Sequence, residues 1–468
     1  MHRRLVVVGG GAAGMSAASA ARRIDPQLEI VVLEAGGYAA YGMCGLPYYL
    51  SGVVPKAQDL LAYPPAYFRE ERRLDLRLRA RVTRIDAERR VVHLREDGRD
   101  ARLDYHRLIV TAGAAPAVPP LPGLDDPWVF TVRTLEDAIR LRSLLDAGHI
   151  GRALIVGAGY IGLEMAEALV ARGVQVTLAE TLPAVMATLD PPISALVEQE
   201  VRRHGVDLRL GTSLEQVRRT AGGLEATLGS SVAAFDVVVI AVGIVPGSGV
   251  AAEAGAATGP GRALLVDDQM RTSLPDVFAA GDCIAPFHRV LGRPAFVPLG
   301  PAANKTGRVA GTVAADGSAR FAGTVGTAVV KVFDLGVAGT GLTLTQATAE
   351  GLPAVATDAV GKSRAKYYPG SAPVHVRLVH EAGGRLLGAQ LIGDDTVAKR
   401  IDVLAVALQA GFGVADLAEL DLSYAPPYAP VYEPVLLAAQ AATASTPAVP
   451  PRDRPVADAQ AAAVGSAP

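Results

Sequence analysis

The chain has 468 residues, 50% of them hydrophobic, with 50 glycines and a formal net charge of −2 at pH 7. This length predicts two or three domains, and the many small and aliphatic residues favour an α/β fold. The near-neutral charge argues against nucleic acid or an anionic membrane as a partner. Cys44 and Cys283 are the only cysteines in the sequence, which excludes a disulfide framework and a zinc site and favours a reducing compartment.

The N-terminus resembles a signal peptide only superficially. Two arginines precede the apolar residues 5–8, but glycines follow at once, and a signal peptide needs a longer apolar core. No uninterrupted apolar stretch elsewhere in the sequence reaches the length of a membrane span. We therefore expect a soluble, cytoplasmic protein with no membrane partner.

The first predicted strand, residues 5–8, is followed by a glycine-rich turn and by a helix that starts near Ala13. The spacing G-x-G-x-x-G is formed by Gly9, Gly11 and Gly14. The first glycine permits a tight turn, the second lets the backbone approach a pyrophosphate, and the third allows the helix to pack closely on the strand. The next strand, residues 30–33, ends at Glu34, an acid placed to bind ribose hydroxyls. A purely structural turn is the alternative, and the complete combination favours a dinucleotide site.

A second strand–glycine–helix segment begins at Ala153. Its glycines, with the same spacing, are Gly157, Gly159 and Gly162. The strand that follows, residues 174–178, leads to Glu180. A carboxylate at this position binds the 2′-hydroxyl of NAD and repels the 2′-phosphate of NADP, so we expect NADH to be preferred over NADPH.

Three further strand ends carry glycines that we expect near the cofactors, namely Gly113, Gly243 and Gly281. Asp282 follows the last of these, and a carboxylate there can bond to the ribityl hydroxyls of a flavin, with the N-terminus of the following helix near the flavin. Because Asp282 comes after the second glycine loop, we expect a discontinuous first domain with the second domain inserted into it. An enzyme with two dinucleotide sites most simply holds FAD and NAD(P)H.

The residue pattern changes from Thr324 onward, where alternating apolar and polar residues predict strands such as residues 329–332 and 374–378. A helix is predicted at about residues 397–410, ending near Gly411. These signals predict an antiparallel-sheet domain with helices. After about Ala441 the composition is rich in Ala, Pro and Ser, which predicts a disordered tail.

Cys44 is the candidate redox residue. A helix is predicted to begin at about Cys44, with Pro47 in its first turn, and a thiol at a helix N-terminus has a lowered pKa because the free N–H groups favour the thiolate. Gly42 and Gly45 leave space for an approaching substrate. A small buried structural thiol is the commoner fate of a lone cysteine, and composition does not decide between the two. For Cys283 we expect the structural role.

These features resemble the pyridine nucleotide–disulfide oxidoreductases. More narrowly, they resemble the single-cysteine branch, which holds coenzyme A-disulfide reductases, NADH oxidases, NADH peroxidases and persulfide or polysulfide reductases. The resemblance extends to about Pro434. Besides the two glycine loops and the segment around Asp282, the matching motifs are residues 44–49, 303–308, 331–334, 367–370, 399–402 and 424–428.

The resemblance implies a homodimer whose subunits have two Rossmann-like domains and a C-terminal α+β dimerisation domain. The implied bounds are residues 1–115 and 247–322 for the FAD domain, 116–246 for the NAD(P)H domain and 323–440 for the dimerisation domain, followed by the tail at 441–468. Electrons would pass from NAD(P)H through FAD to Cys44. The sulfur would then cycle between thiolate and mixed disulfide, persulfide or sulfenic acid.

In coenzyme A-disulfide reductases, tyrosines of the partner subunit approach the reactive sulfur, and the matching residues here are Tyr367 and Tyr424. A phenol can donate a proton to the leaving thiol, whereas packing in a dimer interface is the alternative role for both. Arg23 and Arg72 match positions of cations around the coenzyme A phosphates. A surface arginine is, however, more often a solvated charge.

The neighbours of the cysteine depart from the family pattern. Family members often have Ser-Tyr-Ala-Asn-Cys, where this chain has residues 40–44 as Ala-Tyr-Gly-Met-Cys. Met43 therefore places a bulky apolar side chain where the substrate would bind. Peroxidases of this branch carry a histidine in the first glycine loop, and residues 10–13 contain none.

The favoured activity is the reduction of a small-molecule disulfide, coenzyme A disulfide first. The alternatives are an NADH oxidase that reduces oxygen and a reductase of persulfide or polysulfide. A flavin-bound redox sensor with little turnover is a further alternative from a different class of protein.

Overall fold

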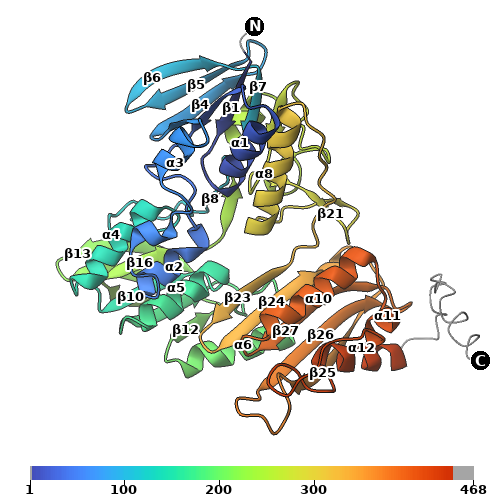
Figure 1. Ribbon diagram of the computed structural model, residues 1–468. Helices are drawn as coiled ribbons and strands as arrows, with labels where there is room; N and C mark the ends of the chain where they lie inside the picture. The colour runs from blue at the N-terminus through green and yellow to red at the C-terminus, as the bar shows by residue number, and fades with distance from the viewer. Residues whose placement is uncertain (1–2, 446–468) are drawn as a thin grey trace, which may run out of the picture. The chain divides into compact units, whose positions relative to one another are not determined.

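The computed structural model describes residues 3–445 and divides into two compact units (Figure 1). The first unit ends at Ala338 and the second begins at Gly339. Strand β24 (Leu335–Gly341) runs across this boundary. Among the described residues, no helix is long and apolar enough to cross a membrane. The cytoplasmic location stays a prediction.

The first unit contains a five-stranded parallel sheet, the first sheet, with the strand order β19-β7-β1-β2-β3. Its strands are β1 (Arg4–Val8), β2 (Glu29–Leu33), β3 (Asp75–Arg77), β7 (Arg107–Val110) and β19 (Val277–Ala279). The central strands are continuous Val, Leu and Ile runs because helices or other elements cover both faces of a parallel sheet. Strand β19 joins this sheet from a point far along the chain, which is consistent with the predicted discontinuous domain.

The second sheet of the first unit is also parallel, with the order β12-β11-β10-β16-β9. Its strands are β9 (Val129–Phe130), β10 (Arg152–Val156), β11 (Gln175–Glu180), β12 (Asp207–Leu210) and β16 (Val237–Ile240). The helices of this part are α4 (Leu135–Asp146), α5 (Tyr160–Val170) and α6 (Pro191–Arg203). Thr134 begins α4 by accepting a hydrogen bond from the Asp137 N–H at 3.1 Å, which is a standard way to satisfy the first turn of a helix.

The chain crosses between the two sheets twice, and the two crossings lie side by side. Strand β8 (Ala114–Pro116) leaves the first sheet, and β17 (Ile244–Pro246) returns to it. These strands pair antiparallel, with Pro116 opposite Ile244. Prolines are tolerated here because a two-stranded ribbon leaves outward N–H positions unpaired.

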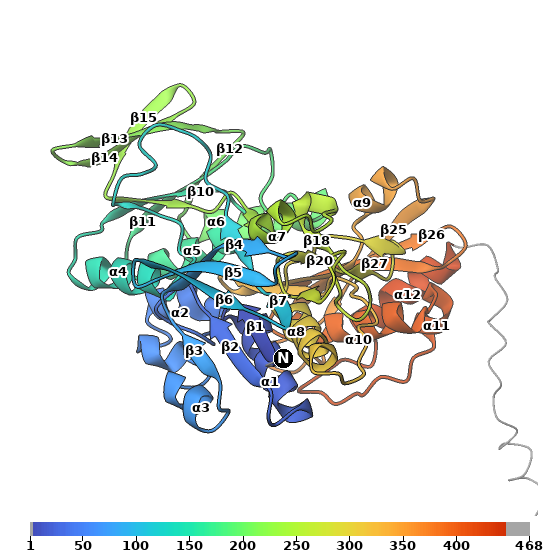
Figure 2. The same ribbon diagram turned by 90° about the horizontal axis from the view of Figure 1, so that it is seen from above.

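The first unit also contains two three-stranded antiparallel sheets, and Figure 2 shows the one formed by β13, β14 and β15 at the periphery of this unit. They consist of β4 (Ala80–Asp86), β5 (Val91–Glu96) and β6 (Arg99–Asp104), and of β13 (Leu214–Thr220), β14 (Gly223–Leu228) and β15 (Ser231–Phe235). Further short elements of this unit are α2 (Leu46–Ser51), α3 (Pro65–Glu70), α7 (Gly249–Glu253), β18 (Leu264–Leu265), β20 (Ile284–Ala285), β21 (Phe287–His288), β22 (Arg293–Pro294) and β23 (Ala328–Val332).

The second unit is built on an antiparallel sheet. In it, β26 (Pro373–Glu381) pairs antiparallel with β25 (Ala354–Lys362) on one side and with β27 (Leu386–Gly393) on the other. Its helices are α9 (Leu344–Ala349), α10 (Val397–Ala410), α11 (Val414–Ala418) and α12 (Pro434–Ala444). The predicted helix at 397–410 is confirmed, and Gly411 ends it in the left-handed conformation, with φ 71°.

The first residues of the predicted tail are helical, contrary to the prediction. Helix α12 continues to Ala444, three residues beyond Ala441, because Pro434 at its first turn and a run of Ala and Leu favour helix. The rest of the predicted tail, from residue 446, lies outside the described residues.

Two helices from distant parts of the sequence pack in unusually close contact. Helix α1 (Ala12–Ile24) lies against α8 (Gly300–Ala314). A Cβ atom added at Gly311 would lie 2.0 Å from the Ala17 carbonyl oxygen, and one at Gly307 would lie 2.2 Å from the Ala13 carbonyl oxygen. Only glycine therefore lets the two backbones approach this closely.

We predict that Gly311→Ala destabilises the protein by about 1–3 kcal/mol or more, because the added methyl group forces α1 and α8 apart. Alanine ordinarily stabilises a helix interior relative to glycine. A loss of stability in Gly311→Ala would therefore come from the contact between α1 and α8. The matched control is Gly300→Ala on the same helix, where a Cβ atom would meet no atom within 4 Å. The apparent Tm measures both variants, and an equal Tm for the two would contradict the packing argument.

Candidate functional site

The first glycine loop connects β1 to α1 in a tight turn. Gly9 has φ +105°, and its N–H donates to the Leu33 carbonyl at 2.8 Å. A Cβ atom at Gly14 would lie 1.8 Å from the Gly9 carbonyl oxygen, so only glycine allows α1 to approach the loop. A Cβ atom at Gly11, by contrast, would meet no atom within 4 Å. The free N–H groups at the start of α1 therefore border open space that can hold a pyrophosphate.

Glu34 lies directly after β2, beside this loop. Its Oε2 accepts the Gly10 N–H at 2.7 Å, and its Oε1 accepts the Gly36 N–H at 2.6 Å. Two backbone donors thus fix the orientation of the carboxylate. Each oxygen keeps a further lone pair that can accept a ribose hydroxyl.

The second glycine loop repeats this geometry between β10 and α5. Gly157 has φ +103°, and a Cβ atom at Gly162 would lie 1.9 Å from the Gly157 carbonyl oxygen. A Cβ atom at Gly159 would again meet nothing within 4 Å. Both loops therefore present a helix N-terminus to open space at the carboxyl edge of a parallel sheet, where such folds bind nucleotides.

Glu180 is the last residue of β11 and stands in the same relation to the second loop. Its Oε2 accepts the Ala158 N–H at 2.8 Å, and its Oε1 accepts the Leu182 N–H at 2.9 Å. Two backbone donors therefore fix the orientation of this carboxylate as well. Its contact with the adenosine ribose, and the preference for NADH, stay predictions.

Three more of the predicted cofactor glycines follow strand ends with positive φ. They are Gly113 with φ +66°, Gly243 with φ +120° and Gly281 with φ +82°. A Cβ atom at Gly281 would lie 2.8 Å from the Cβ of Ala13 on α1. The turn after β19 is thus pressed against the start of the first nucleotide-binding helix.

Asp282 lies next to this turn, and its side chain is 18% exposed. Burial raises the pKa of its carboxyl, while Arg133 acts in the opposite direction from 3.9 Å away. The helix expected directly after Asp282 is not there, because β20 follows instead and α8 begins only at Gly300. The sequence between them contains Pro286 and Pro294, which cannot continue a helix interior.

Cys44 lies in a short 3-10 helix, Met43–Gly45, and not at the start of an α-helix as predicted. Helix α2 begins two residues later, with Gly45 as its N-cap and Pro47 in its first turn. The space at Gly45 is also not open to substrate, because a Cβ atom there would lie 2.4 Å from Leu60 Cδ2. A side chain at this position would have to displace the end of the Leu60 side chain.

The expected lowering of the Cys44 pKa is wrong. The thiol is accessible to solvent, yet the surrounding protein reduces its hydration, and this desolvation raises its pKa. The carboxylates of Glu164 and Asp282 raise it further, while Arg133 lowers it in part. These charges outweigh the weak dipole of a six-residue helix that starts after the cysteine.

Glu164 is the residue whose importance the sequence did not indicate. It lies on α5, one turn after the second glycine loop, and burial together with the neighbouring Glu167 raises its pKa to about 7. Helix α2 packs against α5, which explains why a residue of the second nucleotide segment acts on Cys44. The available signal was a pair of carboxylates, Glu164 and Glu167, in the largely apolar sequence of α5. Arg133 offered no signal, since it lies in a loop before α4.

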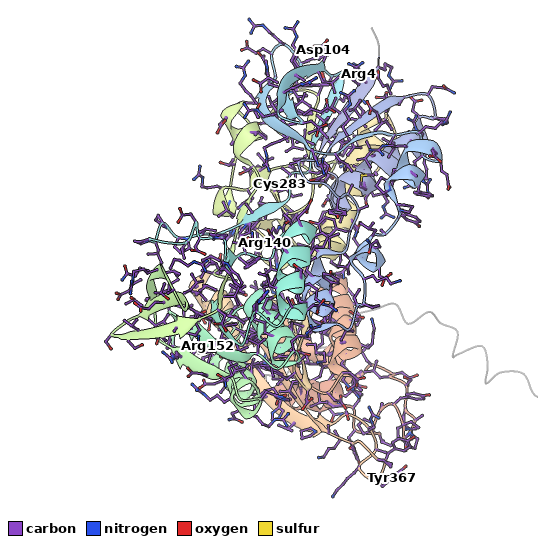
Figure 3. The ribbon with its side chains drawn as sticks, turned by 90° about the vertical axis from the view of Figure 1, so that its left-hand side faces the viewer. Arg4, Asp104, Arg140, Arg152, Cys283 and Tyr367 are labelled. Carbon is purple, nitrogen blue, oxygen red and sulfur yellow. The ribbon has the colours of Figure 1, made fainter. Side chains whose placement is uncertain are left out.

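Cys283 is a structural thiol. It is completely buried in the first unit (Figure 3), and its Sγ donates to the carbonyl oxygens of Val110 at 3.4 Å and Ala280 at 3.3 Å. Burial raises its pKa to about 12. It therefore stays protonated and is unsuited to resolve a disulfide on Cys44.

Tyr367 and Tyr424 lie together in the second unit. Their phenols interact electrostatically, and the residues are 75% and 49% exposed. The interaction with Tyr367 and partial desolvation raise the pKa of Tyr424. Tyr367 lies at the edge of its unit (Figure 3). An approach of either tyrosine to Cys44 stays a prediction.

The predicted substrate residues have less defined surroundings. Arg72 donates from Nε to the Tyr67 hydroxyl at 2.9 Å, and its guanidinium lies 5.3 Å from the centre of the same ring. Arg23 is exposed on the last turn of α1, and Met43 is half-buried beside the cysteine. A role for these three residues in binding substrate stays a prediction.

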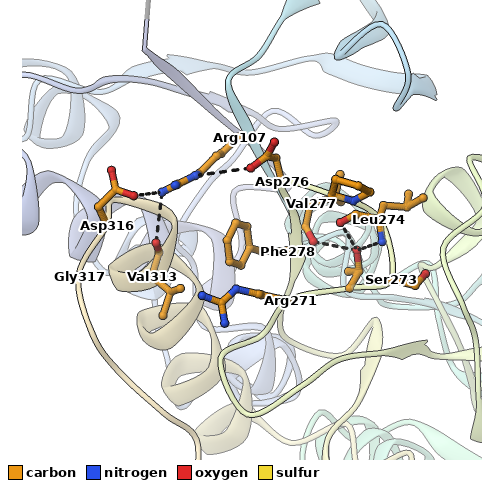
Figure 4. A pocket seen from close by; sticks show the side chains of 12 residues that line it. Arg107, Arg271, Ser273, Leu274, Asp276, Val277, Phe278, Val313, Asp316 and Gly317 are labelled. Atoms are coloured by element: carbon orange, nitrogen blue, oxygen red, sulfur yellow. Dashed lines mark hydrogen bonds and ion pairs between the residues drawn. The ribbon is translucent and has the colours of Figure 1, made fainter.

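A separate cavity of about 430 Å³ lies in the first unit, lined on one side by β7 and β19 (Figure 4). Arg107 reaches Asp316 at 2.6 Å and Asp276 at 4.0 Å, and its Nη1 donates to the Ala314 carbonyl at 3.0 Å. Arg107 and Val277 are the first residues of their strands, so the cavity is at the edge opposite the glycine loops. It is therefore separate from the dinucleotide sites.

Comparison with known proteins gives consistent matches. The family model described as pyridine nucleotide-disulphide oxidoreductase matches residues 3–308, and the model of the corresponding dimerisation domain matches residues 327–434. An NAD(P)H sulfur oxidoreductase (CoA-dependent) of Pyrococcus furiosus is 36% identical over 94% of this chain and 98% of its own length. An NADH oxidase of Methanocaldococcus jannaschii is 32% identical over 93% of this chain and 98% of its own.

Solved structures agree with these matches. An NAD-dependent persulfide reductase from A. fulgidus has a TM-score of 0.90 and 39% sequence identity, over 94% of this chain and 83% of that one. Other similar proteins are named coenzyme A disulfide reductases.

We predict that Glu164→Gln lowers the pKa of the Cys44 thiol, because it removes a negative charge that opposes the thiolate. The Glu164 carboxyl ionises near pH 7, so the two proteins should differ above that pH and converge below it. The rate of alkylation by iodoacetamide as a function of pH reports on Cys44, since Cys283 is buried. Glu198→Gln on α6 is the control, and an unchanged alkylation profile for Glu164→Gln would contradict the electrostatic argument.

Proposed function

Because the chain belongs to the family of pyridine nucleotide-disulphide oxidoreductases, we propose that it uses NADH or NADPH and bound FAD to reduce a small-molecule disulfide at Cys44. The predicted resemblance, fold class and oxidoreductase activity are confirmed by these matches. The dimerisation domain supports a dimeric protein. The substrate itself and the sharing of the site between subunits are part of the proposal.

The residues of the two loops fit the two dinucleotides. The open space at Gly11, with Glu34 beside it, is the proposed site of FAD, and Asp282 is the proposed partner of the flavin's ribityl hydroxyls. The open space at Gly159, with Glu180 beside it, is the proposed site of NAD(P)H. When bound, the nicotinamide and flavin supply a pair of electrons to sulfur.

The observation that carries the proposal is that Cys44 lies in the 3-10 helix directly before α2, a helix that packs against α5 of the second nucleotide segment. Its thiol also interacts electrostatically with Glu164 on α5 and with Asp282, from the turn after the first sheet's edge strand. It is accessible to solvent. A sulfur that a substrate can reach, and that interacts with residues of both nucleotide segments, is suited to receive electrons and pass them on.

The chemistry at Cys44 is thiol–disulfide exchange. The thiolate attacks one sulfur of the substrate, the substrate's S–S bond breaks, and a mixed disulfide forms as the first thiolate leaves. Two electrons from NAD(P)H then break the mixed disulfide, release the second thiolate and restore the Cys44 thiolate. Each leaving thiolate takes up one proton.

Tyr367 and Tyr424 are the proposed proton donors, supplied by the partner subunit. Two exposed phenols whose loops are linked by the Ala365 N–H and the Pro426 carbonyl can approach a leaving sulfur together, and a phenol can donate a proton to it. The raised Cys44 pKa makes such a partner more important, because the protein otherwise disfavours the free thiolate. This role rests on the proximity of the two phenols and on their exposure.

Coenzyme A disulfide is the proposed first substrate. Arg23 and Arg72 supply cations for its phosphates, and relatives are named coenzyme A disulfide reductases. Reduction of persulfide or polysulfide is the second candidate, since a relative 36% identical over 94% of this chain is a sulfur oxidoreductase. Reduction of oxygen is the third, in view of the relative named NADH oxidase. All three use the same reactive sulfur.

We predict that Cys44→Ser keeps its bound flavin, is still reduced by NADH, and loses reduction of coenzyme A disulfide by at least about a thousandfold. Stopped-flow absorbance of the flavin and steady-state release of thiol measure the two steps separately. Cys283→Ser is the control and should retain turnover. Disulfide reduction at the wild-type rate in Cys44→Ser would refute the proposal.

The acceptor is identified by steady-state rates with coenzyme A disulfide, polysulfide, hydrogen peroxide and oxygen, each measured with NADH and with NADPH. We expect the highest kcat/KM with coenzyme A disulfide. Release of sulfide from polysulfide at a greater kcat/KM would replace it with the second candidate. NADH consumption in air at the same rate with and without disulfide would favour the oxidase.

We predict that Glu180→Gln shifts the ratio of kcat/KM for NADPH over NADH upward by about tenfold, because it removes the charge that repels a 2′-phosphate. Glutamine keeps one oxygen that can accept the Ala158 N–H, but its NH2 group cannot accept the Leu182 N–H, so the effect is measured as the ratio of the two nucleotides and not from either rate alone. Steady-state kinetics with both nucleotides measure the ratio, and Glu198→Gln is again the control. A ratio unchanged by the substitution would show that Glu180 does not select the nucleotide.

A further inference from the structure

The two tyrosines of the second unit are carried by two separate loops. Tyr367 lies in the loop of residues 363–372, between β25 and β26, and Tyr424 lies in the loop of residues 419–433, between α11 and α12. Both side chains are exposed, and their phenols interact electrostatically. The position of one phenol relative to the other therefore depends on the contacts that hold the ends of the two loops.

Backbone contacts link the loops near the tyrosines. The Ala365 N–H donates to the Pro426 carbonyl at 3.1 Å, and the Tyr368 N–H donates to the Ala365 carbonyl at 2.8 Å. The first loop thus begins with a turn that rests on the second. One such bond between loops does not fix their ends.

Arg400 fixes those ends. It lies on α10 and is 8% exposed. Its Nη2 donates to the carbonyl of Ser363, the first residue of one loop, at 2.8 Å. Its Nε forms an ion pair with Glu433, the last residue of the other loop. One guanidinium on a rigid helix therefore holds the start of the Tyr367 loop and the end of the Tyr424 loop.

Glu433 is itself tied to a helix. It is 6% exposed, and its Oε2 accepts the Val435 N–H at 2.6 Å as the N-cap of α12. Ser363 is also fixed, because its N–H donates to the Ala372 carbonyl at 2.8 Å and its hydroxyl accepts the Ala372 N–H at 3.1 Å. Both partners of Arg400 are thus immobile parts of the second unit.

A buried ion pair is a poor means of gaining stability, because both charges lose their hydration. It is an effective means of selecting one arrangement, since any other leaves a charge unpaired. The planar guanidinium offers several donors in a fixed fork, whereas a lysine ammonium has no such fixed geometry. An arginine at position 400 can therefore hold two partners in fixed directions.

We propose that Arg400 is a positioning residue that sets the relation of Tyr367 to Tyr424 by clamping the ends of their two loops. The proposal rests on the proposed function, in which these tyrosines donate protons to the leaving thiol. Arg400 does not touch the substrate. Its effect reaches the reaction through the orientation of the two phenols.

The test compares Arg400→Met with Arg377→Met in the complete flavin-loaded protein. Arg377 is the matched control because it is also 8% exposed and paired, with Asp358 at 2.6 Å, but lies within the β25–β26 pair away from both loops. We expect Arg400→Met to lower kcat for the disulfide by roughly tenfold to a hundredfold. The rate of flavin reduction by NADH should stay unchanged, and Arg377→Met should keep both rates.

The second readout is the titration of the tyrosine phenol. The absorbance of tyrosinate against pH, taken as the difference between each protein and its Tyr424→Phe counterpart, isolates the Tyr424 phenol. In Arg400→Met its raised pKa should fall toward the ordinary value, because the two phenols move apart and their interaction weakens. Arg400→Lys should show a smaller change in the same direction. Neither effect is expected in Arg377→Met.

Equal losses of kcat in Arg400→Met and Arg377→Met, with an unshifted Tyr424 phenol, would overturn the proposal and leave Arg400 a structural residue. If Arg400→Met does not fold, Glu433→Gln breaks the same pair while keeping an oxygen for the α12 cap, and the same readouts apply. Full kcat in Tyr367→Phe and Tyr424→Phe would instead refute the proton-donor role. The phenol titration would still decide whether Arg400 positions the pair.

Discussion

The first unit depends on one steric constraint, the contact between a helix backbone and a turn that has no side chain. At Gly14 and Gly162 the helix approaches the preceding loop so closely that a single methyl group would collide with a carbonyl oxygen. This contact fixes the first turns of α1 and α5 at the carboxyl edges of the two parallel sheets. The paired crossings β8 and β17 join these sheets, and the position of every proposed cofactor residue follows from this arrangement.

Electrostatics around Cys44 is the second consequence of this arrangement. Residues from three segments far apart in the sequence, Arg133, Glu164 and Asp282, act on one sulfur. Two carboxylates and partial burial oppose the thiolate, and one guanidinium supports it. An enzyme that raises the pKa of its reactive thiol obtains a stronger nucleophile once it is ionised, at the expense of the fraction that is ionised. The tyrosine pair would help by stabilising the sulfur that leaves.

Local signals allowed much of the fold to be predicted from sequence. Both glycine loops, their acids and the helix Val397–Ala410 were expected correctly, because their determinants lie within a few residues of each other. The errors at Cys44 have a different origin. The side chain that fills the space at Gly45 comes from Leu60, and the charges that raise the thiol's pKa come from residues more than eighty positions away. Spacing along the chain contains no information on such contacts.

The pairing of β8 with β17 has a consequence for how such a protein can be assembled in evolution. Pro116 faces Ile244 across a two-stranded ribbon, so the stretch between them leaves and re-enters the first sheet's domain at a single place. A segment whose two ends meet can be gained, lost or exchanged without redirecting the chain on either side of it. The second nucleotide-binding segment can therefore be exchanged as one unit. Its replacement would alter the electron donor, while the proposed flavin site and Cys44 would stay in the domain of the first sheet.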